Sequence, residues 1–281
     1  MVRLAFLTAL LIAALPAQAL AQGPYGPFGQ PQEDYGPGIT VGGAGLARVQ
    51  APAHLTEEAV QQAIDAARPR AVARAVADAR RRAEAIATAV GVGLGSAEAV
   101  ELGAGFRGRP PCRQSRRTRE VRCVAPAFTS ASVTVTFAIS GGAQSSEGAR
   151  ELSASATGSA PSEPKRQTSP SIRHALFAAR FAATPEAARA ARADVELAAQ
   201  GAGLTIGPLF SIVEQQNFYG YEPVLGSFAA GRYCGTIRRV IVRRDPETGI
   251  RRVVGRRRVR RCFAPRTFEV SLEATYLAQG S

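Results

Sequence analysis

The apolar positions between Ala71 and Val90 recur every three or four residues, which is the spacing of one face of an α-helix. Gly91 follows them and predicts the end of this helix. Thr56 is a typical N-cap for an earlier helix start, and Pro69 either interrupts that helix or begins a second one. The side opposite the apolar face is expected to carry four charged residues, Arg74, Asp78, Arg81 and Arg82.

Other segments alternate between apolar and polar residues, as half-buried strands do. The clearest are residues 132–139 and 268–277, and further strands are predicted at 39–49, 97–102 and 204–213. A second Ala-rich helix is predicted over 187–200, with Thr184 as N-cap, Pro185 at the first helical position and Gly201 at its end.

These elements recur in the same order. Each half of the chain has an Ala-rich helix, a glycine stop, a strand, an Arg-rich segment between two cysteines, and an alternating strand. The junction VRCVAPAFTSASVTVTFAI at 121–139 matches RRCFAPRTFEVSLEATYL at 260–277, so we predict an internal duplication. The expected fold is α+β, with two related halves that each place a helix on an antiparallel sheet, plus disulfide-stapled β-hairpins rich in arginine.

The N-terminus is typical of an export signal. Arg3 is followed by an apolar run from Leu4 to Leu15, too short to span a bilayer, and residues 19–21 form an A-x-A cleavage site. An uncleaved anchor is the alternative. We expect a secreted, periplasmic or envelope protein.

The predicted organisation is a signal peptide (1–21), a flexible Gly/Pro-rich tail (22–38), a first half (39–140), a Ser/Gly/Ala/Pro-rich linker (141–171) and a second half (172–281). Whether the halves form one domain or two stays open.

Four cysteines lie at matching places in the two halves. In an exported protein they favour disulfides, and the repeat favours the pairs Cys112–Cys123 and Cys234–Cys262. A zinc site built from all four is the alternative, although such sites usually have shorter spacings between their cysteines.

The positive charge of the chain is concentrated in the Cys-bracketed segments. The formal net charge is +13, and only one of the 35 basic residues, Lys165, is lysine. Between the arginines of the second segment, Asp245-Pro246-Glu247-Thr248-Gly249 is a strong turn signal, so a hairpin with arginines along both strands is expected. The candidate anion-binding residues are Arg238, Arg239, Arg243, Arg244, Arg251, Arg252, Arg256, Arg257, Arg258, Arg260 and Arg261.

Guanidinium groups bind phosphate and carboxylate in a bidentate manner, so an acidic polymer or an anionic membrane surface is a candidate partner. Two alternatives stay open: a solvated edge hairpin whose charge prevents aggregation, and a contact with an acidic surface in a homo-oligomer. Specific nucleic-acid recognition is not predicted, because few aromatic residues lie among the arginines.

No complete catalytic motif is present. His54 and His174 are isolated histidines, and Glu214 ends a predicted strand without an obvious acidic partner. We therefore predict no enzyme activity, no cofactor and no metal site. An enzyme would need an activity that depends on His174 or Glu214.

Several of these segments resemble the SIMPL domain family. The strand ITVGGAG at 39–45 is similar to the family's first strand with its V-x-G-x-G pattern, and residues 71–102 resemble its Ala-spaced helix, Gly turn and strand. The strand at 206–214 ends in a glutamate, as the family's strand does. The family's usual middle region is abbreviated here, and the Cys-bracketed segments are not part of its pattern.

The resemblance implies an exported or envelope protein. Some family members assemble into large rings, and some are linked to stress tolerance. The leading hypothesis is therefore a non-enzymatic, stress-related envelope protein that acts by assembly or binding. The alternative is a polyanion-binding module that uses the Arg-rich hairpins.

Overall fold

A computed structural model of the chain describes residues 36–51, 56–103, 112–114, 121–146, 149–215 and 226–280. They belong to one compact unit, Tyr35–Ser281, so the two halves pack together as a single unit. The predicted signal peptide and all but the last three residues of the predicted tail lie outside the described residues. No helix among the described residues is long and apolar enough to cross a membrane.

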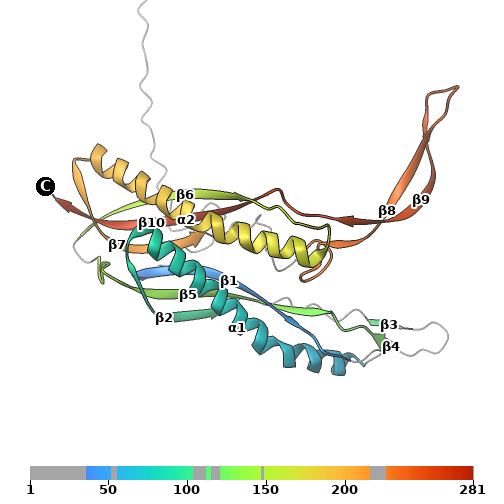
Figure 1. Cartoon of the computed structure of the whole chain (residues 1–281), viewed down its shortest axis with the longest axis horizontal. Coiled ribbons are helices and arrows are strands. Elements are labelled where there is room, and N and C mark those ends of the chain that lie inside the picture. Colours follow the sequence, from blue (N-terminus) through green and yellow to red (C-terminus); the bar gives the residue numbers. More distant parts are fainter. Residues whose placement is uncertain are drawn as a thin grey trace, which may run out of the picture. The chain divides into compact units, whose positions relative to one another are not determined.

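The described fold is α+β, with two long helices and a central six-stranded sheet in the order β2-β5-β1-β7-β10-β6 (Figure 1). Two separate two-stranded hairpins, the short β3-β4 and the long β8-β9, complete it. In chain order the elements are β1 (Gly38–Arg48), α1 (Glu57–Val90), β2 (Gly93–Leu102), β3 (Cys112–Gln114), β4 (Val121–Cys123), β5 (Phe128–Ser140), β6 (Arg150–Pro161), α2 (Ser169–Gly201), β7 (Leu204–Gln215), β8 (Cys234–Arg244), β9 (Arg251–Cys262) and β10 (Thr267–Gly280).

The sheet is mixed, whereas the sequence predicted antiparallel pairing alone. The triplets β2-β5-β1 and β7-β10-β6 are each antiparallel. They are joined by a short parallel ladder between β1 and β7, from Gly38 opposite Ser211 to Thr40 opposite Val213. Pairing between distant strands depends on how the two triplets meet, and the local alternation of residues does not encode it.

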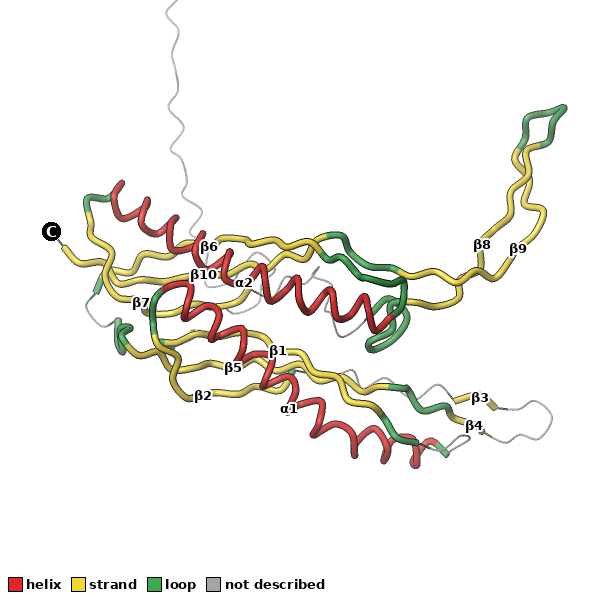
Figure 2. The backbone as a smooth tube through the Cα atoms, in the orientation of Figure 1, coloured by secondary structure: helices red, strands yellow, loops and turns green. Residues whose placement is uncertain are grey.

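Both helices cover the same face of the sheet (Figure 2). Helix α1 packs on β1 and β5, α2 packs on β6 and β10, and the helices contact each other. Glycines allow this close packing: a Cβ at Gly43 or Gly45 would collide with the backbone of Ala75 or Ala71, and one at Gly158 would meet the backbone of Ala183. The V-x-G-x-G pattern of β1 therefore marks where α1 lies directly on the strand.

The linker predicted at 141–171 is wrong over much of its length. Residues Arg150–Pro161 form β6, which pairs with β10 along its whole length. The strand alternates small residues, with Ala154, Ala156 and Gly158 on the side that faces α2 and serine or threonine on the other. Because Ala, Gly and Ser are also typical of linkers, composition concealed the two-residue period.

The start of α2 and the effect of proline on both helices differ from the predictions. Helix α2 begins at Ser169 with Thr168 as N-cap, and Pro185 lies inside it. The buried positions Ile172, Leu176 and Ala179 already have helical spacing, so packing on the sheet stabilises the helix through the proline. Helix α1 likewise runs without a break through Pro69, from the predicted N-cap Thr56 to the predicted stop at Gly91.

Candidate functional site

The strands β8 and β9 form a long antiparallel hairpin, which we call the β8–β9 hairpin. Its base carries the Cys234–Cys262 disulfide, the pairing that the repeat favoured. Its turn uses the predicted residues: the Asp245 carboxylate accepts hydrogen bonds from the backbone N–H groups of Glu247 and Thr248, and Gly249 has a left-handed φ of 69°. The Cys112–Cys123 disulfide links β3 and β4 in the same manner.

The base of the hairpin is anchored in the core. Tyr233 is fully buried, and the Ser169 hydroxyl at the start of α2 accepts hydrogen bonds from the N–H groups of Tyr233 and Cys234, each at 2.9 Å. The N–H of Phe263 donates to the Tyr233 carbonyl, and the Phe263 ring stacks on Phe228 at 5.8 Å. These contacts hold both ends of the hairpin on the body of the protein.

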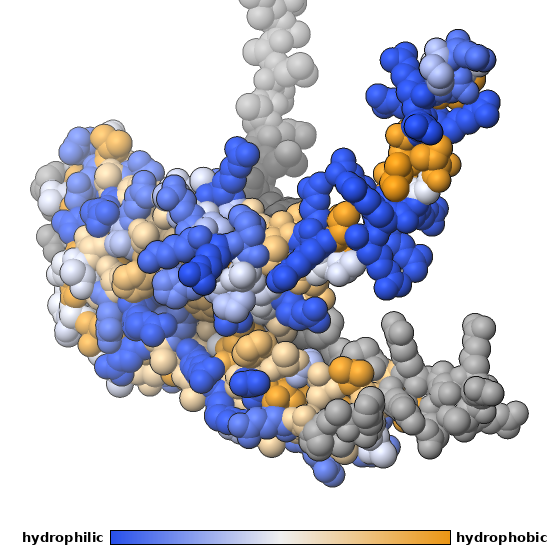
Figure 3. All heavy atoms as spheres, turned by 45° about the vertical axis from the view of Figure 1, so that its right-hand side comes forward, coloured by the Kyte–Doolittle hydropathy of each residue, from blue (hydrophilic) through white to orange (hydrophobic). Residues whose placement is uncertain are grey.

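Beyond its base the hairpin exposes its arginines, which are blue in Figure 3. All eleven candidate anion-binding residues lie here, and the only acidic residues from Cys234 to Cys262 are Asp245 and Glu247, so this segment carries a net charge of +9. No carboxylate among the described residues forms an ion pair with these arginines. The register places four arginine pairs directly opposite one another: Arg238–Arg258, Arg239–Arg257, Arg243–Arg252 and Arg244–Arg251.

Like charges opposite one another across a ladder are destabilising, so this arrangement does not serve the stability of the hairpin. One face carries an open depression lined by Thr236, Arg238, Arg258 and Arg260. The strand geometry spaces side chains on such a face by about 5 Å across the ladder and about 7 Å along each strand. The result is an array of closely spaced guanidinium groups, which on this face includes Arg238, Arg258 and Arg260.

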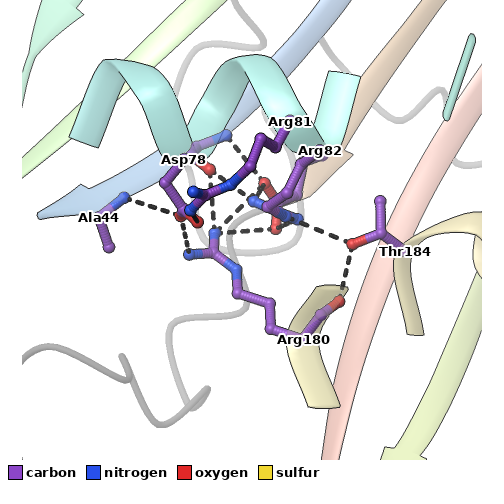
Figure 4. A network of polar contacts seen from close by, with 8 residues as sticks. Ala44, Asp78, Arg81, Arg82, Arg180 and Thr184 are labelled. Carbon is purple, nitrogen blue, oxygen red and sulfur yellow. Dashed lines mark hydrogen bonds and ion pairs between the residues drawn. The ribbon is translucent and has the colours of Figure 1, made fainter. Parts of the chain in front are cut away.

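A second polar cluster lies buried where the two triplets of the sheet meet. We call it the junction cluster: the side chains of Asp78 and Arg82 on α1 and Arg180 and Thr184 on α2, which Figure 4 labels, together with that of Glu214 on β7. Arg82 binds the Glu214 carboxylate through both terminal nitrogens, at 2.7 Å and 2.5 Å, and its Nε donates to the Thr184 hydroxyl at 3.3 Å. Arg180 donates to the same carboxylate at 3.2 Å and lies 3.8 Å from Asp78.

The backbone pairing of β1 with β7 ends at Thr40 and Val213. Beyond this pair, side chains of the junction cluster form the hydrogen bonds to the backbone of β1. The Gly42 N–H donates to Glu214 Oε2 at 2.8 Å, and the Gly42 carbonyl accepts from Arg82 and Arg180. Asp78 accepts from the Ala44 N–H. Side chains from both helices and from β7 thus satisfy the backbone groups of β1 that have no backbone partner on β7.

Charge keeps Glu214 ionised although it is buried. Burial by itself would raise the pKa of this carboxyl, but the charges of Arg180 and Arg82, with hydrogen bonds from Arg82 and Gly42, lower the pKa to about 2. Burial and the charge of Arg180 lower the pKa of the Arg82 guanidinium, and Glu214 opposes that shift. The cluster is therefore a closed set of compensated charges.

Comparison with known families identifies part of the chain. Residues 38–168 match the model of the SIMPL family, described as a protein of unknown function (DUF541). The chain carries a SIMPL domain. No curated protein and no solved structure matches the chain.

The SIMPL match ends at Thr168, the N-cap of α2. It includes Asp78 and Arg82 of the junction cluster but not Arg180, Thr184 or Glu214. The β8–β9 hairpin lies wholly outside it. The match therefore covers the first triplet, α1 and also β6 of the second triplet, and the hairpin has to be interpreted from its own chemistry.

The remaining candidates are placed as follows. His54 lies outside the described residues, and His174 is exposed on α2. Glu214 has basic partners that the sequence analysis missed, because Asp78 and Arg82 are buried and were assigned to the polar side of their helix. The sequence gives only a weak signal for this burial. Asp78 and Arg82 lie on an Ala-rich helix, and small alanine side chains leave space in which a longer side chain from another element can reach them. Among the described residues, no cluster of His, Cys, Asp and Glu could hold a metal ion.

Proposed function

We propose that this chain is an exported, non-enzymatic protein that binds polyanions through the β8–β9 hairpin. The observation that carries the proposal is the register, with four arginine pairs directly opposite one another and no described carboxylate that forms an ion pair with them. A polyanion would remove the repulsion within these pairs. The two disulfides support export, since such bonds persist in oxidising compartments.

The chemistry of arginine favours phosphate or carboxylate ligands. The guanidinium group stays charged, is weakly hydrated and binds these anions with two parallel hydrogen bonds. The anchored base and the disulfide pre-organise the array, so less conformational entropy is lost when a ligand binds.

The test replaces Arg256, Arg257, Arg258, Arg260 and Arg261 with serine and measures binding to heparin or polyphosphate across a salt series. For each phosphate that the variant no longer neutralises, the slope of log K against log salt should fall by roughly 0.7 to 0.9. A matched control removes the same charge from exposed arginines elsewhere, and these are Arg48, Arg70, Arg150, Arg166 and Arg189. An equal decrease in affinity for the two variants, or no decrease for the first, would exclude the hairpin as the binding site.

Assembly is a second candidate function, favoured by the edges of the central sheet. In the described part of the chain, β2 and β6 have no outer neighbour, and β2 is exposed along most of its length. The two triplets follow one another in the same order across the sheet, so contact between β6 of one copy and β2 of the next would continue the sheet head to tail.

Light scattering on the oxidised protein tests this candidate. A large, salt-stable oligomer that dissociates in Val100→Lys with Leu102→Lys supports assembly through β2. Leu197→Lys, an exposed apolar position on α2, is the control. A monomer at every salt concentration would exclude assembly and leave binding as the function.

The duplication also belongs to this proposal. Both helices end near a glycine with a left-handed φ, Gly91 and Gly203, and both lie on a glycine of the preceding strand, Gly45 and Gly158. Both Cys-bracketed segments form disulfide-linked hairpins. A duplicated ancestor accounts for these correspondences, and the second hairpin would then be the copy elaborated for binding.

A further inference from the structure

The β8–β9 hairpin also exposes aliphatic side chains that a soluble polyanion would not need. Val242 on β8 lies opposite Val253 on β9, and its neighbours along the two strands include Val240, Ile241 and Val254. Each of these five side chains is between 41% and 64% exposed. We call these five residues the aliphatic belt. Figure 3 shows the belt as an orange patch on the hairpin with blue arginine side chains on either side of it.

Arginines flank the belt along both directions of the hairpin. Toward the base lie the opposite pairs Arg238–Arg258 and Arg239–Arg257, and Arg256 lies directly opposite Val240. Toward the turn lie the opposite pairs Arg243–Arg252 and Arg244–Arg251. The aliphatic side chains are therefore enclosed by guanidinium groups within one pre-organised element.

We propose that the β8–β9 hairpin binds the surface of an anionic lipid bilayer, with the aliphatic belt in the interface and the flanking arginines on lipid phosphates. The inference rests on the proposed polyanion binding and names its partner. Interfacial binding of this kind combines buried apolar area with attraction to anionic headgroups. Long arginine side chains can reach the headgroups while their stems stay among apolar groups.

The composition of the hairpin separates this partner from other polyanions. An acidic polymer in solution is bound by charge and gains nothing from exposed valines. Single-stranded nucleic acid is bound largely by stacking on aromatic side chains, and residues 234–262 include no Phe, Tyr or Trp. An anionic bilayer surface can contact both the arginines and the exposed aliphatic side chains of the hairpin.

The dimensions of the belt favour a hairpin that lies along the surface. Three consecutive strand residues span about 10 Å, far less than the roughly 30 Å of a hydrocarbon core. Entry from the turn would carry Arg243, Arg244, Arg251 and Arg252 into hydrocarbon, which is costly. A depth of about 5 to 10 Å places the belt at the boundary between headgroups and acyl chains.

The first experiment measures co-sedimentation of the oxidised full chain with phosphatidylcholine vesicles with or without phosphatidylglycerol. The belt variant Val240→Ser, Val242→Ser, Val253→Ser should bind anionic vesicles at least about tenfold more weakly than the wild type while it keeps its heparin affinity. The variant with five arginines replaced by serine should bind both vesicles and heparin more weakly than the wild type. Leu197→Ser, which removes an exposed aliphatic side chain on α2, is the control.

A fluorescence experiment tests insertion directly, because the chain has no tryptophan. The indole introduced by Val240→Trp should shift to the blue with anionic vesicles and be quenched by brominated acyl chains. The indole introduced by Leu197→Trp should do neither. A Val240→Trp spectrum already shifted without vesicles, together with a lower native mass for the belt variant, would mean that a second copy covers the belt and would overturn the inference.

The remaining outcomes separate the inference from the proposed function. If the wild type binds heparin but not anionic vesicles, or if the belt variant binds vesicles like the wild type, the lipid inference fails and polyanion binding stands. If the wild type binds neither heparin nor vesicles, the proposed function fails and the inference fails with it.

Discussion

In the junction cluster, Arg82 is buried and each nitrogen of its guanidinium group donates to Glu214, Gly42 or Thr184. In the β8–β9 hairpin, arginines are exposed and face other arginines across the ladder. The same side chain therefore stabilises one region and opposes the stability of the other. The two roles of arginine differ because carboxylates lie within ion-pair distance of Arg82, whereas no described carboxylate pairs with the arginines of the hairpin.

The two regions also depend on different supports. The junction cluster joins both helices to β1 and β7, so its charges are fixed by the core around them. The hairpin depends on the disulfide and the buried Tyr233 at its base. A region with compensated charges gains rigidity, whereas a region with uncompensated charges stays available to a partner. Substitutions in both regions test this contrast.

Glu214→Gln should lower the free energy of unfolding by about 3 to 5 kcal/mol, because it leaves the buried Arg82 without a counter-charge. Denaturant unfolding of the oxidised protein measures the decrease. Glu269→Gln, on the exposed side of β10, is the matched control and should change stability by less than about 0.5 kcal/mol. Equal effects of the two substitutions would show that the cluster does not hold the triplets together.

Acid should weaken the same cluster. The pKa of Glu214 is lowered from 4.5 to about 2 in the folded protein, so its contribution is complete above pH 4.5 and is lost as the pH falls toward 2. The decrease in stability should be on the order of 3 kcal/mol across this range. Unfolding measured from pH 6 to 2 tests the slope, and Glu214→Gln should flatten it. An unchanged slope in that variant would assign the acid sensitivity to other groups.

Gly45→Ala should cost about 1 to 3 kcal/mol, because the added Cβ would collide with the Ala71 backbone and push α1 away from β1. Thermal unfolding measures this destabilisation. At Gly201 a Cβ would meet no atom within 4 Å, so Gly201→Ala is the control and should be neutral or stabilising. A neutral Gly45→Ala would mean that the helix does not lie as close to the strand as the packing requires.

Removing one arginine should increase stability in the hairpin and decrease stability in the junction cluster. Arg257→Thr relieves the repulsion from Arg239 and should make the hairpin more stable by about 0.2 to 1 kcal/mol. Arg82→Met should be strongly destabilising. Hydrogen exchange of the hairpin amides measures the first effect, which should shrink at high salt because the charges are exposed. Faster exchange in Arg257→Thr would show that the opposite arginines do not repel.

Local sequence signals predicted much of the fold. The Asp245–Gly249 turn, the N-cap at Thr56 and the helix stop at Gly91 all match the structure. The repeat also favoured the cysteine pairing that the structure has. Each of these features depends on residues close in the chain or on a pattern that repeats along it.

The features that the sequence analysis missed depend on contacts across the fold. The strand β6 was taken for a linker because its small residues become a buried face only when α2 covers them. The parallel ladder between β1 and β7 arises only where the two triplets meet. Arg82 and Glu214 are 132 positions apart, and neither is recognisable as buried until the other is in place.

Local sequence carries the helix and turn signals and the concentration of arginine in one segment, and its repeat favours the disulfide pairing. Tertiary structure decided which charges are compensated: it brings carboxylates to Arg82 and Arg180 and sets the hairpin's arginines opposite one another. The physical reason is that a turn or a cap is stabilised by neighbouring residues, whereas the energy of a charge depends on burial and on every other charge nearby.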